Sequence, residues 1–195
     1  LFLVNSYYEY ELIESTRDDA AGEAFDKTAK MLGLGYPGGP LLSQWASKGS
    51  MNSVVFPRSL MSKHEKGFSF SGLKTSVGNY LKRHYLNKSG TFELSDIDLS
   101  NICASIQEAI VEPLVIKTLR KALEFNIANV CISGGVSANY RLRELFFNHS
   151  KNKSINIFFP QNEFCVDNAA MMGFLAYQKI INGHNKNEFM NLSFG

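Results

Sequence analysis

A pair of glycines, Gly134 and Gly135, stands directly after a short apolar run and directly before a segment with helical character. Glycine permits positive φ values and lets a ligand approach the backbone, while a helix start offers unpaired N–H groups and a partial positive charge. Such a junction suits the sugar or phosphate of a nucleotide. The same residues fit an ordinary strand-to-helix turn in which Ser137 caps the helix that Asn139 begins. On these residues alone both interpretations stay open.

Two aspartates could add carboxylate chemistry. Asp26 follows the apolar Phe25 within an acidic stretch and precedes a glycine loop at residues 37–40, so its carboxylate could accept a hydrogen bond from a ribose hydroxyl. The alternative is a solvated acidic helix face. Asp167 lies where the last apolar segment starts, and it is either a helix N-cap or a metal ligand at the edge of a sheet.

Several other catalytic patterns are absent from the sequence. The histidines are not spaced with cysteines or acids as in zinc sites, and neither H-E-x-x-H nor G-x-x-x-x-G-K-[ST] occurs. Ser71 and Lys74 match the S-x-x-K of penicillin-binding enzymes, but the companion motifs S-D-N and K-T-G are missing. No catalytic nucleophile or base is therefore assigned.

The elements that must position these residues can be predicted from spacing. Apolar residues between Ile97 and Phe125 recur every three or four positions and predict one long amphipathic helix, in which Pro113 could cause a kink. The following segments predict strand, helix, strand and helix, over residues 129–133, 138–149, 155–159 and 167–181. The two strands should be parallel with a right-handed crossover, so both following loops reach the same carboxyl edge of the sheet.

The first half of the chain predicts shorter elements. Two β-type runs, Leu1–Val4 and Tyr8–Ile13, predict a hairpin. Thr16, Asp18 and Asp19 offer caps for a helix within residues 18–33. The remaining segments predict a rigid loop at 36–40, a short helix at 41–47, a strand at 54–56, a helix to about residue 85 and a loop at 87–95.

Composition limits the class of protein. The chain has 195 residues, of which 45% are hydrophobic and 19% charged, with a net charge of +2, so one domain or two small lobes with a real core are expected. Three cysteines without C-x-x-C spacing favour a reducing compartment. Since no signal peptide and no apolar run of ~18 residues is apparent, a cytoplasmic protein without a membrane span is predicted.

Three basic clusters could contact RNA, although solvated helix faces explain most such clusters. They comprise Lys82, Arg83, His84 and Lys88; Lys117, Arg120 and Lys121; and Arg141 and Arg143.

Five motifs occur in order: D-D-A-A-G-E-A-F-D-K at 18–27, Y-P-G-G-P at 36–40, F-S-F-S-G-L-K-T at 68–75, G-G-V-S-A-N at 134–139 and C-V-D-N-A-A-M at 165–171. Together they resemble the C-terminal part of the TsaD/Kae/Gcp family of tRNA adenosine threonylcarbamoyltransferases. The resemblance implies an α/β protein of the actin-like ATPase (ASKHA) fold, in which residues 1–195 are an RNase H-like C-terminal lobe with inserted helices. This lobe would comprise a hairpin at 1–14, an insertion with ligand loops at 15–95, and a helix plus βαβα unit at 96–195. The N-terminal lobe of the family would not be present in these 195 residues.

The resemblance also implies an activity and its ligands. The family transfers the threonylcarbamoyl group from threonylcarbamoyl-adenylate to the exocyclic amine of the adenosine next to the tRNA anticodon. Expected partners are tRNA and TsaB-like and TsaE-like proteins, and expected ligands are an adenylate or ATP-type molecule and a divalent metal, iron rather than zinc. A homodimer through the surface that the other lobe would cover is a further expectation.

Two alternatives remain beside this resemblance. One is a non-catalytic ASKHA paralogue that serves as a TsaB-like dimerisation scaffold, which would have no need for polar groups at a cleft. The other is a different ASKHA enzyme, such as a sugar kinase or a hydrogenase-maturation carbamoyltransferase, which the elements at 21–27 and 68–75 do not suit.

Carried over position by position, the resemblance implies that Asp167 is a metal ligand. It implies substrate-binding roles for Asp26, Gly39 and Asn139, with Gly134 and Gly135 as secondary candidates.

The chain departs from the family in two places. The family's H-x-x-x-H metal ligands and its S-G-G-H loop do not occur here, so a closed metal site cannot form and the isolated chain is expected to be inactive. Glu14 and Ser15 stand where the family usually has Gly-Glu, which predicts a different loop geometry there.

Overall fold

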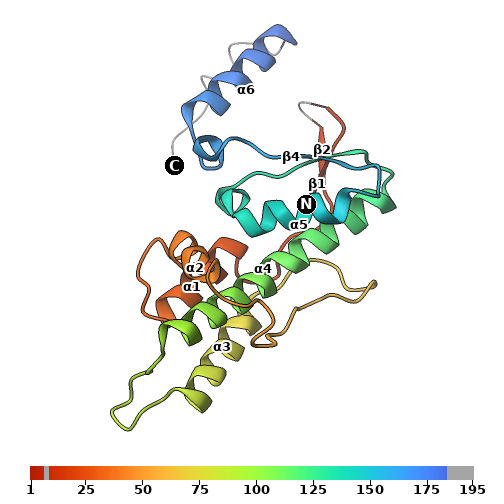
Figure 1. The fold of residues 1–195 in the computed structure, drawn as a ribbon. Coiled ribbons are helices and arrows are strands. Elements are labelled where there is room, and N and C mark those ends of the chain that lie inside the picture. Colours follow the sequence, from red (N-terminus) through yellow and green to blue (C-terminus); the bar gives the residue numbers. More distant parts are fainter. Residues whose placement is uncertain (7–8, 184–195) are drawn as a thin grey trace.

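A single long helix, α4 (Asp96–Glu124), runs through the middle of the molecule in the computed structural model, which describes residues 1–6 and 9–183 (Figure 1). Ser95 caps α4 by accepting a hydrogen bond from the Asp98 amide at 3.1 Å. Most of its 29 residues are buried, and the predicted helix is confirmed, with Pro113 inside it. Contrary to the sequence expectation, α4 is long and apolar enough to cross a membrane. However, 72% of that apolar window is buried by the rest of the protein.

Three helices pack around the first half of α4: α1 (Ala21–Met31), α2 (Gly38–Ala46) and α3 (Ser71–His84). The helices α1 and α3 come so close that a Cβ added to Gly78 would lie 2.8 Å from Cε of Met31. The buried residues of α1 are Ala24, Phe25, Thr28 and Ala29. All three helices lie within residues 15–95.

The strands lie around the second half of α4 and form two separate sheets. β1 (Phe2–Val4) pairs antiparallel with β2 (Tyr10–Leu12), as predicted, although Tyr8 of the expected second strand lies outside the described residues. β3 (Asn129–Cys131) pairs in parallel with β4 (Asn156–Phe158), which confirms the predicted parallel pair. The helix α5 (Tyr140–Ser150) connects these two strands and packs on α4.

Two short 3₁₀ helices and a last α-helix complete the described chain. The 3₁₀ helices η1 (Gly135–Ala138) and η2 (Asn162–Phe164) follow β3 and β4 respectively. The last helix, α6 (Ala169–Ile181), buries none of its residues and lies apart from the other helices in Figure 1.

Two local predictions in the first half were wrong. Gly38, Gly39 and Pro40 form the first turn of α2 rather than a loop, because the first turn of a helix needs no N–H from proline. Residues 54–56 form no strand, because the Val54 amide donates to Ser105 Oγ on α4 at 3.1 Å and the backbone is thus satisfied by a helix side chain.

Asp18 caps α3, not α1 as predicted. Its carboxylate accepts hydrogen bonds from the Phe70 amide at 2.8 Å and from the hydroxyls of Ser69 and Ser71 at 2.6 and 2.8 Å. Desolvation raises the pKa of the Asp18 carboxyl, but these hydrogen bonds outweigh desolvation and hold the pKa well below its ordinary value. Asp18 therefore ties the start of α3 to the chain just before α1.

The variant Asp18→Ala should lower the free energy of unfolding by about 1 kcal/mol at pH 7, the usual cost of losing a helix cap. Because the folded-state pKa is lowered, this stabilisation is complete above the unfolded pKa of about 4 and is lost as the pH falls towards the folded-state value. Urea unfolding at pH 7 and pH 3 measures the free energy of unfolding of wild type and variant, with Asp167→Ala as a control at an exposed aspartate. If Asp18→Ala lowered the free energy of unfolding equally at both pH values, the assignment of Asp18 as the cap of α3 would be contradicted.

Candidate functional site

The helix α2 connects the site residues that the sequence places in separate segments. Its first residue, Gly38, donates its amide hydrogen bond to Oδ1 of Asp26 at 2.8 Å. One turn further, Ser43 Oγ accepts a hydrogen bond from Nδ2 of Asn139 at 2.8 Å. The structure thus brings Asp26, Gly39 and Asn139 onto contacting elements, and one carboxylate oxygen of the half-buried Asp26 has no hydrogen bond within the described residues.

Asn139 joins three helices. It is the N-cap of α5, and its Oδ1 accepts a hydrogen bond from the Leu142 amide at 2.9 Å. Its Nδ2 donates to Ser43 on α2 and, at 2.9 Å, to Oε1 of Gln107 on α4. Both amide hydrogens are therefore used inside the protein, and Asn139 fixes where the loop after β3 lies. The prediction that Ser137 caps this helix was wrong, because residues 135–138 form η1 and the helix starts one residue after Asn139.

Ser137 is buried beside the glycine loop and does not act as the predicted helix cap. It is only 1% exposed, and its Oγ has no hydrogen-bond partner among the described residues. Buried hydroxyls are nearly always paired, so an unpaired one is a candidate contact for a ligand. The sequence interpretation missed this role because serine before a helix is usually a cap.

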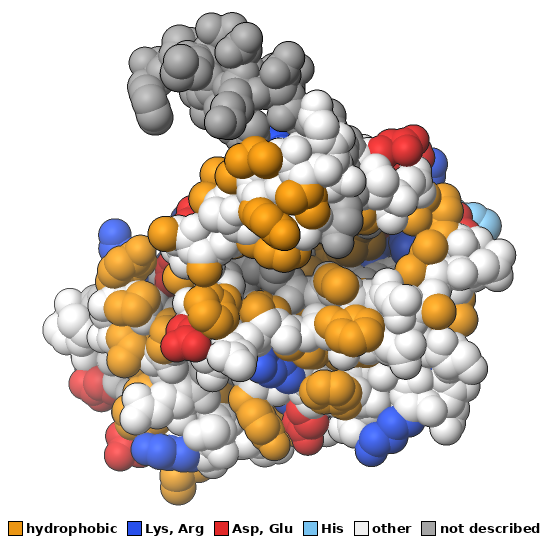
Figure 2. All heavy atoms as spheres, turned by 90° about the horizontal axis from the view of Figure 1, so that it is seen from above, with side chains coloured by type: hydrophobic (Ala, Val, Ile, Leu, Met, Phe, Trp, Pro, Cys, Tyr) orange, Lys and Arg blue, Asp and Glu red, His pale blue; other side chains and the backbone are white. Residues whose placement is uncertain are grey.

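Ser137, Gly134 and Gly135 line a cleft of about 700 Å³. Most of the cleft wall is apolar and comes from β1, β3, the C-terminal part of α4 and the start of α1. Gly134 has a φ of 87°, a left-handed value that favours glycine. A Cβ added to Gly22 on α1 would lie 3.8 Å from Val136, so α1 starts beside the glycine loop. Figure 2 shows hydrophobic side chains gathered around a hollow on the side of the molecule that is seen from above.

Arg143 connects the loops that follow β3 and β4. Its Nε donates to the Ser137 carbonyl oxygen at 2.7 Å and its Nη2 to the Pro160 carbonyl oxygen at 2.9 Å. The guanidinium lies 5.0 Å from the ring centroid of Phe159, and Nη2 is 3.5 Å from Sγ of Cys165. The sequence placed Arg143 in a basic cluster, and no signal in the sequence identifies it as the residue that holds these two loops together.

Asp167 lies beyond this contact network. It is not the N-cap of α6, because Asn168 has that role and accepts a hydrogen bond from the Met171 amide at 2.9 Å. Asp167 is exposed and makes no hydrogen bond or ion pair within the described residues. No group of three or more His, Cys, Asp or Glu residues that could hold a metal is found there either, and His184 lies outside the described residues. The described residues alone thus do not fit a metal ion.

The two glycines that start α2 should respond differently to alanine. A Cβ on Gly38 would lie 2.7 Å from both Cα of Asp26 and Cβ of Ala29, so Gly38→Ala must displace Asp26. We expect a loss of about 1–3 kcal/mol in the free energy of unfolding. Gly39→Ala is the matched control, since its Cβ would meet only Cβ of Phe25 at 3.8 Å and alanine favours a helix. Equal effects of the two variants in urea unfolding would contradict this packing.

Sequence comparison decides the family. The family model for TsaD, tRNA N6-adenosine threonylcarbamoyltransferase, matches residues 1–174. The chain belongs to the TsaD family. The tRNA N6-adenosine threonylcarbamoyltransferase of Desulfotalea psychrophila is 45% identical over 182 residues, which are 93% of this chain and 52% of that protein. The protein of the same name from Kosmotoga olearia is 44% identical over 184 residues, 94% of this chain and 52% of its own length. The chain thus spans about half the length of these curated TsaD relatives.

A solved structure supports the fold assignment. HypF from T. kodakarensis matches 82% of this chain and 20% of its own chain with a TM-score of 0.56 and 20% sequence identity, so the two share a fold. Together with membership of the TsaD family, the mixed α/β architecture is consistent with the ASKHA-type fold that the sequence motifs imply.

Proposed function

We propose that these 195 residues form the C-terminal, RNase H-like lobe of a tRNA N6-adenosine threonylcarbamoyltransferase and provide one wall of its adenylate site. The observation that carries the proposal is the unpaired, buried Ser137 hydroxyl next to the glycine loop, at a cleft in a chain of the TsaD family. The relatives' names support the reaction, which transfers threonylcarbamoyl to an adenosine of tRNA.

Each candidate residue has a part in this proposal. Asp26 lies one helical turn after Gly22, which lines the cleft, and its unpaired oxygen would accept a hydrogen bond from a ribose hydroxyl. Gly39 would leave room for the ligand beside it. Asn139 would act mainly by holding the glycine loop in place, since both of its amide hydrogens are already used.

The metal site would be shared with residues outside this chain. Asp167 would provide one oxygen ligand, and the remaining ligands would come from the half of the family's length that these 195 residues do not cover. Because one carboxylate leaves most coordination positions to water, the transfer reaction would need both halves of the protein. TsaB-like and TsaE-like partners and a cytoplasmic location belong to the same proposal.

Only one of the three basic clusters has side chains that are not engaged in contacts among the described residues, so it is the one that would be available to bind tRNA. Arg141 pairs with Glu108 and Glu144, and Arg143 is held by the loops that it connects. The side chains of the central cluster on α4 are bound to carbonyl oxygens or carboxylates: Lys117 to Leu60 and Glu65, Arg120 to Met61 and Ser62, and Lys121 to Glu124.

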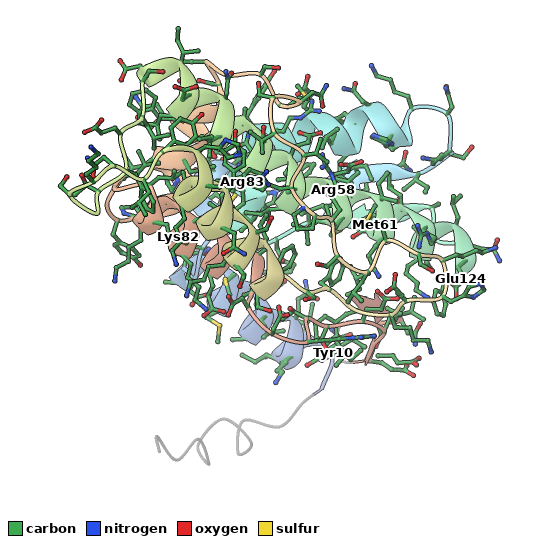
Figure 3. All side chains as sticks on the ribbon, turned by 90° about the horizontal axis from the view of Figure 1, so that it is seen from below. Tyr10, Arg58, Met61, Lys82, Arg83 and Glu124 are labelled. Atoms are coloured by element: carbon green, nitrogen blue, oxygen red, sulfur yellow. The ribbon has the colours of Figure 1, made fainter. Side chains whose placement is uncertain are left out.

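The remaining cluster lies on α3. Lys82 and Arg83 are exposed in its last turn and have no ion pair within the described residues (Figure 3). Residues 66–92 contain no acidic residue, and acidic side chains lie near both ends of α3, Asp18 at its start and Glu93, which binds Asn87, after its end. Since α3 starts beside Asp18 and α1, its exposed side extends away from the candidate site, along a path that a tRNA phosphate backbone could follow.

The double variant Lys82→Ala/Arg83→Ala should weaken tRNA binding on the order of tenfold and lower the slope of log K against log salt by about 1.4 to 1.8. Lys151→Ala/Lys153→Ala after α5 removes the same charge elsewhere and should change neither. Fluorescence anisotropy with labelled tRNA over a salt series measures both quantities. Equal weakening by the two double variants would show a net-charge effect and no α3 contact.

The activity itself is tested by adding threonylcarbamoyl-adenylate and unmodified tRNA and measuring the modified nucleoside by mass spectrometry. We expect transfer by the full-length protein, a large loss with Asp167→Ala, and none by the 195-residue chain. Transfer by the 195-residue chain at catalytic concentration would falsify the shared-site proposal. A folded full-length protein that transfers nothing with its partner proteins present would favour the TsaB-like scaffold.

A further inference from the structure

Arg143 lies in the first turn of α5 and contacts both loops that border the glycine pair. Side chains of a helix lean towards its N-terminus, so Arg143 reaches back over η1, which precedes α5. Its Nε donates to the carbonyl oxygen of Ser137 and its Nη2 to that of Pro160. One guanidinium group therefore sets how the loop after β3 lies relative to the loop after β4.

Both backbone hydrogen-bonding groups of Ser137 are held in place. Its amide donates to the Gly134 carbonyl oxygen at 2.8 Å, and its carbonyl oxygen accepts the bond from Arg143 at 2.7 Å. The hydroxyl is the one hydrogen-bonding group of this buried residue that has no partner among the described residues. Because Ser137 lines the cleft, Arg143 contributes to the place of a free hydroxyl at the candidate site.

The loop after β4 packs against the glycine pair as well. A Cβ added to Gly135 would lie 3.8 Å from Val166 of this loop. The neighbouring Cys165 is buried, and its Sγ lies 3.5 Å from Nη2 of Arg143. The bond from Arg143 to Pro160 thus helps to keep this loop against the glycine pair.

The surroundings of Arg143 suit a holding role. The planar guanidinium carries its donors in a fixed fork, so two different nitrogen atoms can bind two loops at once. The ring of Phe159 lies 5.0 Å from the guanidinium and packs against it. Arg143 has no carboxylate partner among the described residues, so its polar contacts are those with the two loops.

We propose that Arg143 is a positioning residue of the candidate ligand site and acts on the ligand through Ser137. In the proposed function, on which this role rests, the Ser137 hydroxyl contacts the adenylate. A ligand then meets a hydroxyl whose place is already set, so less conformational freedom is lost on binding. Without Arg143 the loop after β3 would occupy a wider range of positions, and the affinity for the ligand would fall although Arg143 touches no ligand atom.

A double-mutant cycle in the full-length protein tests this dependence, with ATP as the probe and isothermal titration calorimetry as the measurement. We expect Ser137→Ala and Arg143→Met each to weaken ATP binding on the order of tenfold, because each removes or misplaces one hydrogen bond. The combined variant should bind ATP about as weakly as Ser137→Ala alone, because residues that act through one another do not give additive effects.

Two outcomes of the cycle would overturn the positioning role. A loss of roughly a hundredfold in the combined variant, the product of the single losses, would mean that Arg143 acts independently of Ser137. ATP binding that Ser137→Ala leaves unchanged would reject the proposed contact with the adenylate, and the positioning role would fall with it.

Two further variants separate the position of Arg143 from its charge and from general stability. Arg120→Met on α4 also removes an arginine that binds two carbonyl oxygens of a loop, those of Met61 and Ser62 at 3.1 Å, and should leave ATP binding unchanged. Arg143→Lys keeps the positive charge but has one donor nitrogen instead of two, so it should lose most of the affinity that Arg143→Met loses. ATP affinity equal to that of wild type in Arg143→Lys would mean that charge alone matters, against the proposal.

Hydrogen exchange without ligand tests the holding of the loops separately from the proposed function. The amides of Ser137 and Phe164 donate to Gly134 and Gln161 at 2.8 and 2.9 Å. Both should exchange about fivefold faster or more in full-length Arg143→Met than in wild type, and Arg120→Met should leave both rates unchanged. Equal rates in wild type and Arg143→Met would contradict the positioning role, whatever the ATP titrations show.

Discussion

The burial of α4 on nearly all sides is the constraint on which the rest of the structure depends. A 29-residue helix with so many buried residues must be covered by other elements, because its apolar surface is not confined to one stripe. The helices α1, α2 and α5 pack directly on α4, and α3 lies alongside its first half (Figure 1). The loops that carry the candidate site residues lie where these covering elements meet.

The polar residues on α4 decide how these covering elements are arranged. Gln107 binds Asn139 and so fixes the start of α5, while Glu108 accepts two hydrogen bonds from Arg141, at 2.8 Å each. The nearly inaccessible Lys117 donates to two carbonyl oxygens of the loop at 58–67, on the face that Figure 3 shows with Arg58 and Met61. Desolvation lowers the pKa of Lys117, and the nearby Glu14 carboxylate opposes this effect. A buried charge that loses its partner is costly, so such pairs favour the one arrangement of the covering elements in which each charge keeps its partner.

Glu14 is a buried ion-pair centre. Its carboxylate accepts a hydrogen bond from the Gly67 amide at 3.0 Å and lies 3.8 and 3.5 Å from the amino groups of Lys117 and Lys121. Glu14 therefore ties the segment before α1 to α4 and to the loop that contains Gly67. The altered loop geometry at Glu14 stays a prediction.

Short-range spacing of apolar residues in the sequence was sufficient to predict most of the framework. The spacing of apolar residues predicted α4 and the parallel pair of β3 and β4 because these features depend on side chains only a few positions apart. Capping was harder to predict. Asp18 caps a helix that starts 53 residues later, at Ser71, and Asn168, rather than its neighbour Asp167, caps α6. The partner of Asp18 is set by a tertiary contact that the local sequence does not encode, whereas at α6 the local sequence offers two adjacent capping residues.

At the candidate site, the structure shows contacts that the sequence analysis did not predict. Asn139 was singled out for a ligand, yet its amide joins three helices, whereas the unpaired hydroxyl belongs to Ser137. Arg143 was grouped with surface charges, although it holds two loops together. The geometry thus separates residues that shape the wall of the cleft from those that remain free to contact a ligand.

We infer that these residues form one wall of an adenylate site and that the rest of the protein completes it. Isothermal titration calorimetry with ATP, as a probe of the adenosine-binding part of the site, tests this inference. We expect no saturable binding to the 195-residue chain up to millimolar ATP, and much tighter binding of one ATP per chain to the full-length protein. Equal affinity of the two proteins for ATP would contradict it.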